Sequence, residues 1–468
     1  MSLASTYTET PAIFLQPRPL ARTPGSFVLL RLLPQPRPVK PLPAEVWFKV
    51  LSYVVDDGED GRMGLPERRA RSRKKWELLF VCKSWVNVVL PLLYSRIHIF
   101  TVSTLQKFVA HLASSDQRWD SIRRIPYSTP GRWVQTLDLS EIVLEHSTEL
   151  LSVDSNLIRL FPLLPFLTSL YLVPEMLLSN RVLAALQAKD GIGELRSLKG
   201  VKVSVPVGDA SAQPPAPSPD AVIRLLGNCP RLEQLEIACP DVNSLELESV
   251  LDMDLSSFRD EAEVTPPPLH FPDLKSLCLC PIPIGSLFLA LLRTPLPALR
   301  HLVVAPHTAQ LSAILAAHGR GLISLRINTP RHLSTTIGDV PPPPVLTSCP
   351  ELHHLALDQQ LLPVLTLLEP AQDDGGSVGA SGSPHPHPHP LRVLTIPRPN
   401  ARFFREVEAL LPRLPSLTVV RARTVRWLRA GVTGKALEAG VQGEMHEWRH
   451  RFARRGVRLV DGDWRDPG

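Results

Sequence analysis

A leucine spacing that recurs along the chain restricts its possible folds more than any other feature. The spacing is Pro-x-Leu-x-x-Leu-x-[Leu/Ile/Val], and full copies begin at Pro165, Pro230, Pro272, Pro297 and Pro350. Weaker copies, which lack the leading proline or vary one position, begin at Val134, Leu195, Leu322, Leu391 and Leu417. Together the copies cover residues 130–422 of the 468-residue chain. An internal repeat of this kind predicts similar units stacked side by side.

Each copy predicts a short strand whose alternate residues, such as Leu277 and Leu279, point into a core. Segments with apolar residues at helical spacing lie between the copies and can cover the other side of that core. These segments are Asp220–Leu226, Gly285–Arg293, Thr308–His318 and Arg402–Leu411. One strand and one helix cannot bury their apolar faces alone, but stacked units can. We therefore expect an α/β solenoid with parallel strands on one side and helices on the outer face.

The repeat resembles the leucine-rich repeat family, with two departures. The family carries Asn or Cys three residues after the last strand leucine, and here those positions hold Glu175, Pro240, Ile282, His307, Pro330 and Gln360. The copies are also unevenly spaced, since 25 residues separate Leu274 from Leu299 and 39 separate Leu352 from Leu391. The resemblance implies an irregular horseshoe with loops on one face. An ordinary α/β domain with leucine-rich strands is the structural alternative.

Ahead of the repeat, a shorter stretch predicts three small helices. Pro43 suits the first turn of a helix, where its missing N–H costs no hydrogen bond. Apolar residues recur at helical spacing in three sets: Trp47, Val50, Leu51 and Val54; Trp76, Leu79 and Phe80; and Trp85, Val88, Val89 and Leu92. Pro91 should prevent the last helix from continuing straight. A unit of about 50 residues buries little core, so part of its apolar surface should face another protein.

This stretch resembles the F-box, the motif by which substrate receptors dock on the Skp adaptor of SCF-type cullin-RING ubiquitin ligases. The match consists of Leu42-Pro43-x-Glu45-Val46, Val50-Leu51 and Val81-Cys82-Lys83-x-Trp85. The resemblance implies that a set of these residues forms or supports the docking surface, namely Leu42, Pro43, Val46, Val50, Leu51, Val81, Cys82 and Trp85. It also implies a cullin scaffold reached through the adaptor and a protein target bound by the repeat face. A helical unit that only covers the N-terminal end of the solenoid is the alternative.

An insertion at residues 56–75 separates the first two predicted helices, where the family usually has a short turn. Acidic residues open the insertion, and a basic cluster closes it, made of Arg68, Arg69, Arg71, Arg73, Lys74 and Lys75. A solvated loop, a nuclear import signal and a contact to nucleic acid or another acidic partner are all compatible with this cluster.

The last part of the chain predicts a terminal element for the solenoid. An amphipathic helix is expected from the spacing of Leu437, Val441, Met445, Trp448 and Phe452. Gly456 is a plausible C-cap, and Val457, Leu459 and Val460 can add a last strand. The polar outer side that a solenoid end requires would come from Arg449, Arg451, Arg454 and Arg455. A separate partner-binding helix is the alternative.

These observations divide the chain into four parts. We expect a disordered, proline-rich leader at 1–39, the F-box unit at 40–95, the solenoid at 96–430 and the capping helix and strand at 431–468. The leader contains neither a signal peptide nor a membrane anchor by its sequence pattern. Six cysteines without a secretory signal favour a reducing compartment, so the expected location is cytoplasmic, nuclear or both.

The sequence holds no pattern that predicts catalysis. No phosphate-binding glycine loop, nucleophile elbow or nucleotide fingerprint occurs. The His385, His387 and His389 tract should be extended and mobile, and is therefore a poor metal site. Cys278 and Cys280 should share one side of a strand, and small buried residues are the expectation for the cysteines. We expect a non-catalytic ligase adaptor without a cofactor. The rival functions are a repeat scaffold outside ubiquitin transfer and a nuclear protein associated with nucleic acid.

Overall fold

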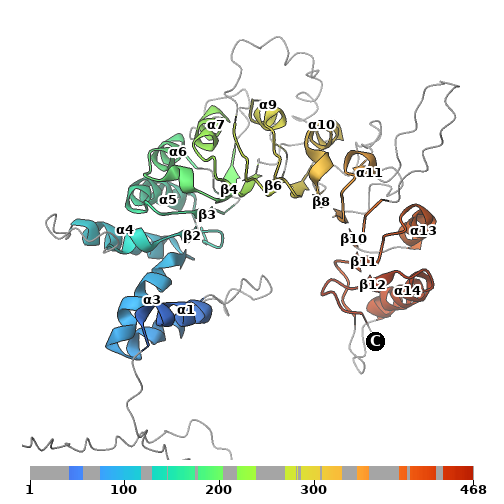
Figure 1. Cartoon of the computed structure of the whole chain (residues 1–468), viewed down its shortest axis with the longest axis horizontal. Helices are drawn as coiled ribbons and strands as arrows, with labels where there is room; N and C mark the ends of the chain where they lie inside the picture. Colours follow the sequence, from blue (N-terminus) through green and yellow to red (C-terminus); the bar gives the residue numbers. More distant parts are fainter. Residues whose placement is uncertain are drawn as a thin grey trace, which may run out of the picture.

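The computed structural model shows an arch with strands along its inner side and helices along its outer side (Figure 1). It describes residues 42–55, 74–117, 129–144, 146–173, 176, 178–203, 219–238, 269–280, 282, 286–305, 308–328, 345–357, 389–397, 401–427 and 436–466. In these ranges the strands form one twelve-stranded sheet, in which strand order follows chain order from β1 to β12. Neighbouring strands are parallel throughout. The α/β solenoid predicted from the leucine spacing is confirmed.

The strands coincide with the leucine copies. Their bounds are β1 Arg96–His98, β2 Thr136–Asp138, β3 Ser169–Tyr171, β4 Ser197–Lys202, β5 Gln234–Ala238, β6 Ser276–Leu279, β7 His301–Val304, β8 Ser324–Ile327, β9 His354–Leu357, β10 Val393–Ile396, β11 Val419–Ala422 and β12 Arg458–Val460. Every full and weaker copy forms a strand, and β12 is the predicted last strand. Strand β1 is not predicted by the leucine spacing, because its segment carries isoleucines instead.

Helices α1 and α3 precede the first strand, and the helices from α4 onward lie between strands on the convex side of the arch. Their bounds are α1 Ala44–Val55, α3 Lys83–Ser95, α4 Val102–Gln117, α5 Ser147–Leu160, α6 Asn180–Gln187, α7 Pro219–Gly227, α9 Ser286–Arg293, α10 Thr308–His318, α11 Val345–Ser348, α13 Ala401–Leu410 and α14 Ala436–Ala453. The four helices predicted between repeats agree with α7, α9, α10 and α13 to within one residue at each end. Among the described residues, no helix has the length and apolar character needed to cross a membrane.

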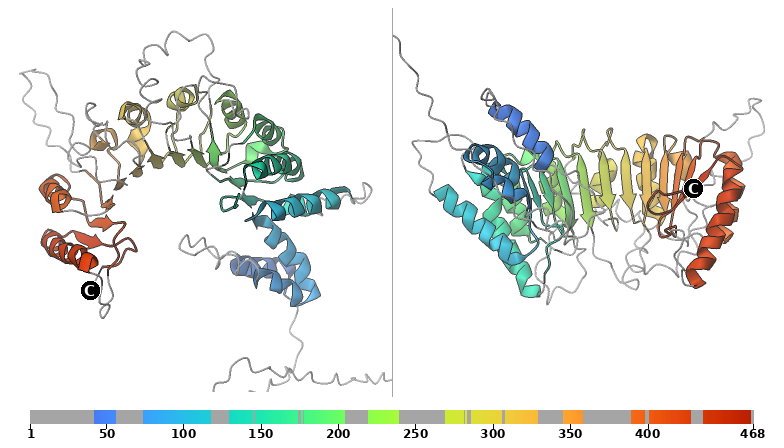
Figure 2. Two further views of the ribbon diagram at one scale, coloured as in Figure 1. Left: turned by 180° about the vertical axis from the view of Figure 1, so that it is seen from behind. Right: turned by 90° about the horizontal axis from the view of Figure 1, so that it is seen from below.

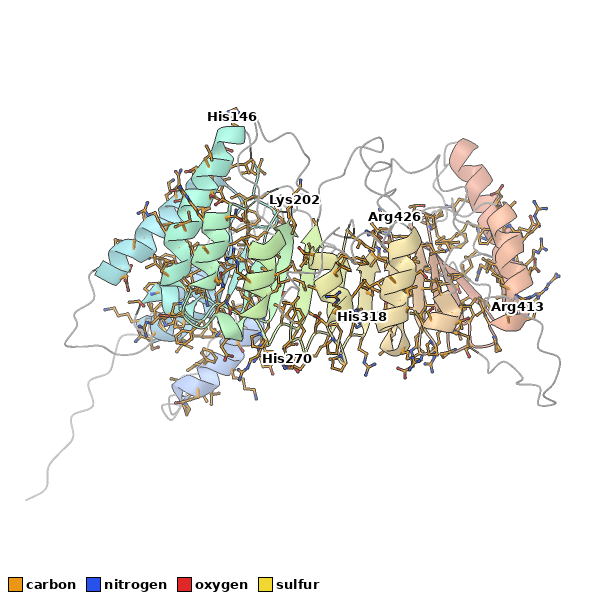
Figure 3. All side chains as sticks on the ribbon, turned by 90° about the horizontal axis from the view of Figure 1, so that it is seen from above. His146, Lys202, His270, His318, Arg413 and Arg426 are labelled. Carbon is orange, nitrogen blue, oxygen red and sulfur yellow. The ribbon has the colours of Figure 1, made fainter. Side chains whose placement is uncertain are left out.

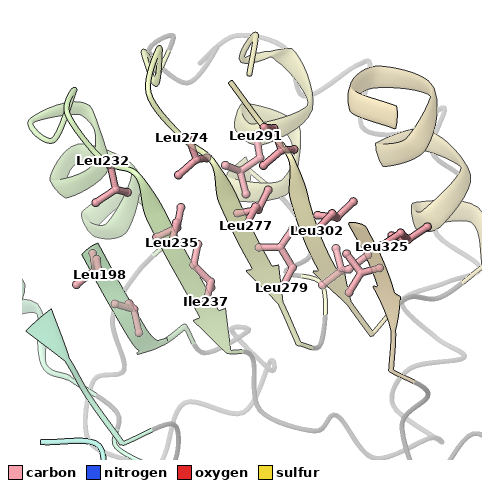
Figure 4. Close-up of a cluster of buried hydrophobic side chains, with 14 of the residues drawn as sticks. Leu198, Leu232, Leu235, Ile237, Leu274, Leu277, Leu279, Leu291, Leu302 and Leu325 are labelled. Atoms are coloured by element: carbon pink, nitrogen blue, oxygen red, sulfur yellow. The ribbon is translucent and has the colours of Figure 1, made fainter. Parts of the chain in front are cut away.

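The core lies between the sheet and the outer helices. Leu235, Leu277, Leu302 and Leu325 occupy equivalent positions on β5 to β8 and stack along the arch (Figure 4). All four are buried, together with the second core residue of each strand, and one apolar cluster extends through the repeats. Burying one such side chain contributes about 2 kcal/mol to the stability of the fold. The stacking of many copies therefore stabilises strands that are only three to six residues long.

The parallel arrangement gives the arch two different long edges. The N-terminal ends of the strands lie along one edge, and their C-terminal ends lie along the other. Figure 3 shows the difference: Lys202 and Arg426, at or after strand ends, lie along one edge, whereas His270 and Arg413, before strands, lie along the other. Much of the chain between 204 and 388 that falls outside the described residues follows the C-terminal ends of strands.

A bulge in β4 shows how the fold tolerates an irregular repeat. Leu198 pairs with Leu235 and Val201 pairs with Ile237, so two residues of β4 stand opposite one residue of β5. The extra residue is Gly200, whose φ of 77° lies in the left-handed region that favours glycine. The bulge returns Val201 to the core, where it is buried.

The C-terminal helix and strand close the opposite end of the arch from α1 (Figure 2). Met445, Trp448 and Phe452 of α14 are buried, and the Trp448 ring stacks on Phe404 of α13 at a centroid distance of 4.9 Å. The predicted C-cap is present: Gly456 has a φ of 75°, and its N–H donates to the Ala453 carbonyl.

Two of the arginines assigned to the outer side of this helix are instead paired with α13. Arg451 donates to the Glu408 carboxylate at 2.7 Å, and Arg455 lies 3.4 Å from the same group. The reason is that Glu408 faces the groove between the two helices, where each partner needs a counter-charge. Arg454 is exposed, as expected for a polar outer face.

Candidate functional site

The N-terminal helices form a small unit with a core of its own, which we call the head (residues 42–55 and 74–95). Leu51, Val89, Leu92 and Leu93 are buried between α1 and α3, in a cluster separate from the repeat core. The rings of Trp47 and Trp85 flank this cluster with centroids 5.1 Å apart. A core of this size stabilises the helices but leaves much of their surface uncovered.

One face of α1 is apolar and exposed. The residues that form it, here called the α1 stripe, are Leu42, Val46, Val50, Tyr53 and Val54. Their exposed fractions lie between 42% and 72%. The spacing of Val46, Val50, Tyr53 and Val54 places these four on one side of α1, and Leu42 comes just before the helix begins. Leu51 lies on the opposite side, where it is 2% exposed. A helix that is apolar on both sides normally has both sides covered, so the α1 stripe is typical of an interaction surface.

A second exposed apolar group lies just before α3. Phe80 is 87% exposed and Val81 is 59% exposed, and Cys82 at the N-cap of α3 is exposed as well. The Cys82 thiol lies 3.1 Å from the Ser84 hydroxyl, and this hydrogen bond lowers the pKa of the thiol. These residues add to the apolar surface of the head without contributing to its core.

The residues predicted for docking therefore separate into two groups. Leu42, Pro43, Val46, Val50, Val81 and Cys82 are exposed. Trp85 is half-buried and Leu51 belongs to the core, so these two can only support a docking surface from beneath.

Two details of the predicted helices are wrong. Trp47, Val50, Leu51 and Val54 do not act as one face, because α3 covers the side of α1 that carries Trp47 and Leu51 and leaves Val50 and Val54 exposed. Phe80 points away from the core that Leu79 contacts.

Pro91 lies inside α3, which continues to Ser95. The carbonyl that loses its bond belongs to Asn87, an exposed residue whose oxygen water can reach.

The basic cluster falls mostly outside the described residues, which exclude Arg68, Arg69, Arg71 and Arg73. Lys74 is exposed. Lys75 donates from Nζ to the Val55 carbonyl at 2.6 Å and so binds the C-terminal end of α1, where a cation also complements the helix dipole. Lys75 therefore has a structural contact within the head.

The head is joined directly to the arch, because α3 ends at Ser95 and β1 begins at Arg96. The Ser95 carbonyl accepts the N–H of Gln135 at 3.0 Å. Tyr94 connects the two parts further, since its hydroxyl lies 3.1 Å from Nε2 of His111 and its ring meets the ring of Trp133 at 5.9 Å. These contacts fix the position of the head relative to the first repeats.

The concave face of the arch consists of the strand residues that alternate with the core residues. The first concave row is Arg96, Thr136, Ser169, Ser197, Gln234, Ser276, His301, Ser324, His354, Val393, Val419 and Arg458. The second row is His98, Asp138, Tyr171, Lys199, Glu236, Cys278, Val303, Arg326, Ala356, Thr395, Arg421 and Val460. The face is polar in most places, as expected for a surface that recognises a partner through side chains.

Contacts between neighbouring strands hold several of these side chains in place. Near the N-terminal end, Nδ1 of His98 lies 2.9 Å from the Asp138 carboxylate, and the Lys199 ammonium lies 5.0 Å above the Tyr171 ring. The hydrogen bonds of Asp138 with His98 and Ser140 outweigh its burial and lower the pKa of its carboxyl.

Cys278 and Cys280 share the concave side of one strand, as predicted, with their sulfurs 3.8 Å apart. They are half-buried rather than part of the core, whereas Cys229 and Cys349 are fully buried. The contact between the two thiols raises the pKa of Cys278 and lowers that of Cys280.

His389 differs from the expectation for its tract. Nδ1 accepts the Leu391 N–H at 3.2 Å, so Nε2 carries the proton and donates to the Cys349 carbonyl at 3.0 Å. This residue thus packs between two repeats as a neutral imidazole, and its burial lowers its pKa. His385 and His387 lie outside the described residues. Within the described part of the chain, no three His, Cys, Asp or Glu side chains gather as a metal-ligand set.

Comparison with known proteins adds little to this geometry. No protein-family model and no curated protein matches the chain. One solved structure with some likeness is the complex of Rad7 and Elc1 from yeast. The match covers 89% of this chain and 93% of that chain at 13% sequence identity, with a TM-score of 0.30. A score this low establishes neither a family nor a shared arrangement of repeats.

Proposed function

We propose that this chain is a substrate-recognition adaptor of an SCF-type ubiquitin ligase. The head docks on a Skp-type adaptor, which connects it to a cullin scaffold, and the concave face of the arch binds a protein target. The observation that supports this proposal is the α1 stripe, an exposed apolar face on the first helix of the segment that resembles the F-box.

The α1 stripe by itself is too small to hold an adaptor tightly. Covering the remaining surface of five half-exposed apolar side chains contributes about 1 kcal/mol each. Association costs about 4 to 15 kcal/mol in lost translational and rotational freedom, so the stripe alone gives weak binding at best. Phe80 and Val81 supply further exposed apolar surface, and a stable complex requires them to be covered as well.

The chain would hold the target in position and would not itself catalyse ubiquitin transfer. Because α3 leads directly into β1, a target on the concave face would be held at a defined place relative to the docked adaptor. Holding two molecules together raises their effective concentration by several orders of magnitude without any catalytic group in the connecting chain. Ubiquitin transfer would then be performed by other subunits, and this chain would need no cofactor.

Co-purification with a Skp-type adaptor tests the proposal. The full chain should form a 1:1 complex with the adaptor, and deletion of residues 40–94 should abolish it. Val50→Glu should do the same, because it places a carboxylate in the middle of the α1 stripe. Leu151→Glu is the matched control, since Leu151 is 69% exposed on the outer helix α5. Retention of the adaptor by the deletion or by Val50→Glu, with the fold intact by circular dichroism, contradicts the proposal.

The same experiment separates the rival functions. A repeat scaffold outside ubiquitin transfer would be soluble alone and indifferent to the adaptor. A nuclear protein associated with nucleic acid would show steep salt-dependent retention on DNA or RNA, lost when the basic residues from Arg68 to Lys75 are neutralised.

A further inference from the structure

The charge on the concave face changes along the arch. From β1 to β5, Asp138 and Glu236 lie among basic residues of the two concave rows. From β6 to β12, the strands contain no Asp or Glu, while the concave rows carry His301, Arg326, His354, Arg421 and Arg458. The C-terminal half of the concave face is therefore basic.

Three of these basic side chains gather on neighbouring strands. Arg326, His354 and Arg421 lie on β8, β9 and β11, which span about 14 Å at the usual strand spacing. Besides burial, the positive charges of Arg421, His301 and Arg326 lower the pKa of His354, which shows that the groups are close enough to repel one another. An anion bound among these groups would offset the positive charge of the arginines and favour the protonated form of His354.

Hydrogen bonds orient this basic group. Nε of Arg326 donates to the Asn328 side-chain oxygen at 2.9 Å, and Nε2 of His354 lies 2.9 Å from the Thr395 hydroxyl. Arg421 donates to the Gly462 carbonyl, so its guanidinium is held against the segment that follows β12. The side chains are half-buried and reach solvent on the concave side.

That segment places an aromatic ring beside Arg421. Trp464 is 45% exposed, and its φ of 64° lies in the left-handed region, which is uncommon for a bulky residue. The Arg421 guanidinium lies 4.6 Å from the ring centre. Because Arg421 belongs to the second concave row, the ring that its guanidinium covers lies next to the concave face. The ribbon at the C-terminal end of the arch is shown in Figures 1 and 2.

A buried carboxylate holds this conformation. Asp461 is 1% exposed and accepts the backbone N–H groups of Trp427, Asp463 and Arg465. These bonds offset the backbone strain at Trp464, which costs about 1 to 3 kcal/mol. Strain of this size on an exposed aromatic residue indicates a position used for binding. Tryptophan and arginine are also among the residue types enriched where a few residues dominate an interface.

We propose that Arg326, His354, Arg421 and Trp464 bind an acidic segment of a protein target. The carboxylates of that segment pair with the basic group, and an apolar residue next to them packs on Trp464. This inference deepens the proposed function and rests on it, because it takes the arch as the part that binds the target. Nucleic acid fits less well, since sites for it neutralise many phosphates along a continuous track. The C-terminal half of the concave face carries three arginines, Arg326, Arg421 and Arg458.

Fluorescence anisotropy with a labelled Glu- and Ser-rich peptide containing one Leu tests the inference on the full chain, with and without the adaptor. The peptide should bind saturably and more weakly at high salt, whereas its Gln-for-Glu counterpart should not bind. Arg326→Glu should weaken binding by about tenfold, which corresponds to ~1.4 kcal/mol, and Arg326→Lys should weaken it less. Trp464→Ala should also weaken it.

Arg293→Glu is the matched control, because this exposed arginine lies on the outer helix α9 and undergoes the same charge change. Equal binding of both peptides, or equal weakening by Arg293→Glu and Arg326→Glu, would overturn the inference. So would stronger binding of single-stranded RNA that Arg326→Glu abolishes. Adaptor co-purification is measured on the same samples. Peptide binding without adaptor binding defeats the proposed function alone, and adaptor binding without peptide binding defeats this inference alone.

Discussion

Replacing Gly200 by alanine should break the contact between the repeats that contain β3 and β4. Gly200 has a φ of 77° at the bulge in β4, and a Cβ atom added there would overlap the backbone carbonyl of Leu172. The carbonyl belongs to the chain itself and cannot rotate away as a side chain could. The two strands would have to separate to make room.

The expected cost is worked from three contributions. An alanine in the left-handed region costs about 1 to 2 kcal/mol. Separation of the strands strains the bond from the Leu172 N–H to the Lys199 carbonyl, now 2.9 Å long, which is worth about 0.5 to 1.5 kcal/mol. Repacking the buried Val201 and Leu172 side chains costs about 1 to 3 kcal/mol. Together these terms predict a destabilisation of about 3 to 6 kcal/mol.

Urea unfolding and hydrogen exchange measure the effect. Because each repeat contacts mainly its neighbours, the loss should concentrate in the β3 and β4 amides and diminish toward β9. Gly443→Ala is the control: Gly443 lies within α14 with open space at its Cβ position, so alanine should stabilise the helix by about 1 kcal/mol. If Gly200→Ala changes the free energy of unfolding by less than about 0.5 kcal/mol, the role assigned to the bulge is wrong.

Three further changes test other parts of the structure. Phe404→Ala removes the ring stacked on Trp448 and should cost about 3 to 5 kcal/mol, seen as faster hydrogen exchange in α14. Burial lowers the pKa of His318 and His389, so both bind protons more readily in the unfolded chain. The free energy of unfolding, measured with urea at several pH values, should therefore fall as the pH drops below about 6.5. Leu51→Ala should cost the head about 2 to 5 kcal/mol and weaken adaptor binding, while exchange in β6 stays unchanged.

Each of these changes has a control in the same chain. Leu151→Ala is the control for the Phe404 and Leu51 variants. Because Leu151 is exposed, this change should alter the free energy of unfolding by less than about 0.5 kcal/mol. His318→Gln should reduce the pH dependence, since Nε2 of His318 bonds the Leu291 carbonyl from a buried position. A pH dependence that this variant leaves unchanged would assign the effect to other groups. Equal loss of protection in β6 and in the head would contradict the separation of the two cores.

The leucine spacing was sufficient to predict the solenoid. Alternation along a strand and stacking of similar units are local rules, so they can be read from residues close together in the chain. Strand β1 was not predicted, because Ile97 and Ile99 stand where the repeat would have leucines. Helix α5 was not predicted either, although its sequence has apolar residues at helical spacing, namely Val153, Leu157 and Leu160. The irregular spacing from Leu198 to Val201 was visible in the sequence.

Other features depended on contacts between distant residues. The sequence showed that α1 is apolar, but the packing of α3 decided that Leu51 is buried and Val50 is exposed. The left-handed backbone at Gly200 follows from its closeness to Leu172 on the neighbouring strand, which no local pattern reveals.

The amino-acid sequence by itself thus determined the repeat, the strand positions and the presence of a helical head, because each depends on periodicity within a short window. The tertiary structure alone decided which side chains meet on the concave face. Arg326, Arg421 and Trp464 are separated by up to 138 positions in the chain, and parallel stacking together with the turn around Asp461 brings them to one surface. Charge and aromatic surface combine there because the strands stack at a fixed spacing, whatever the length of chain between them.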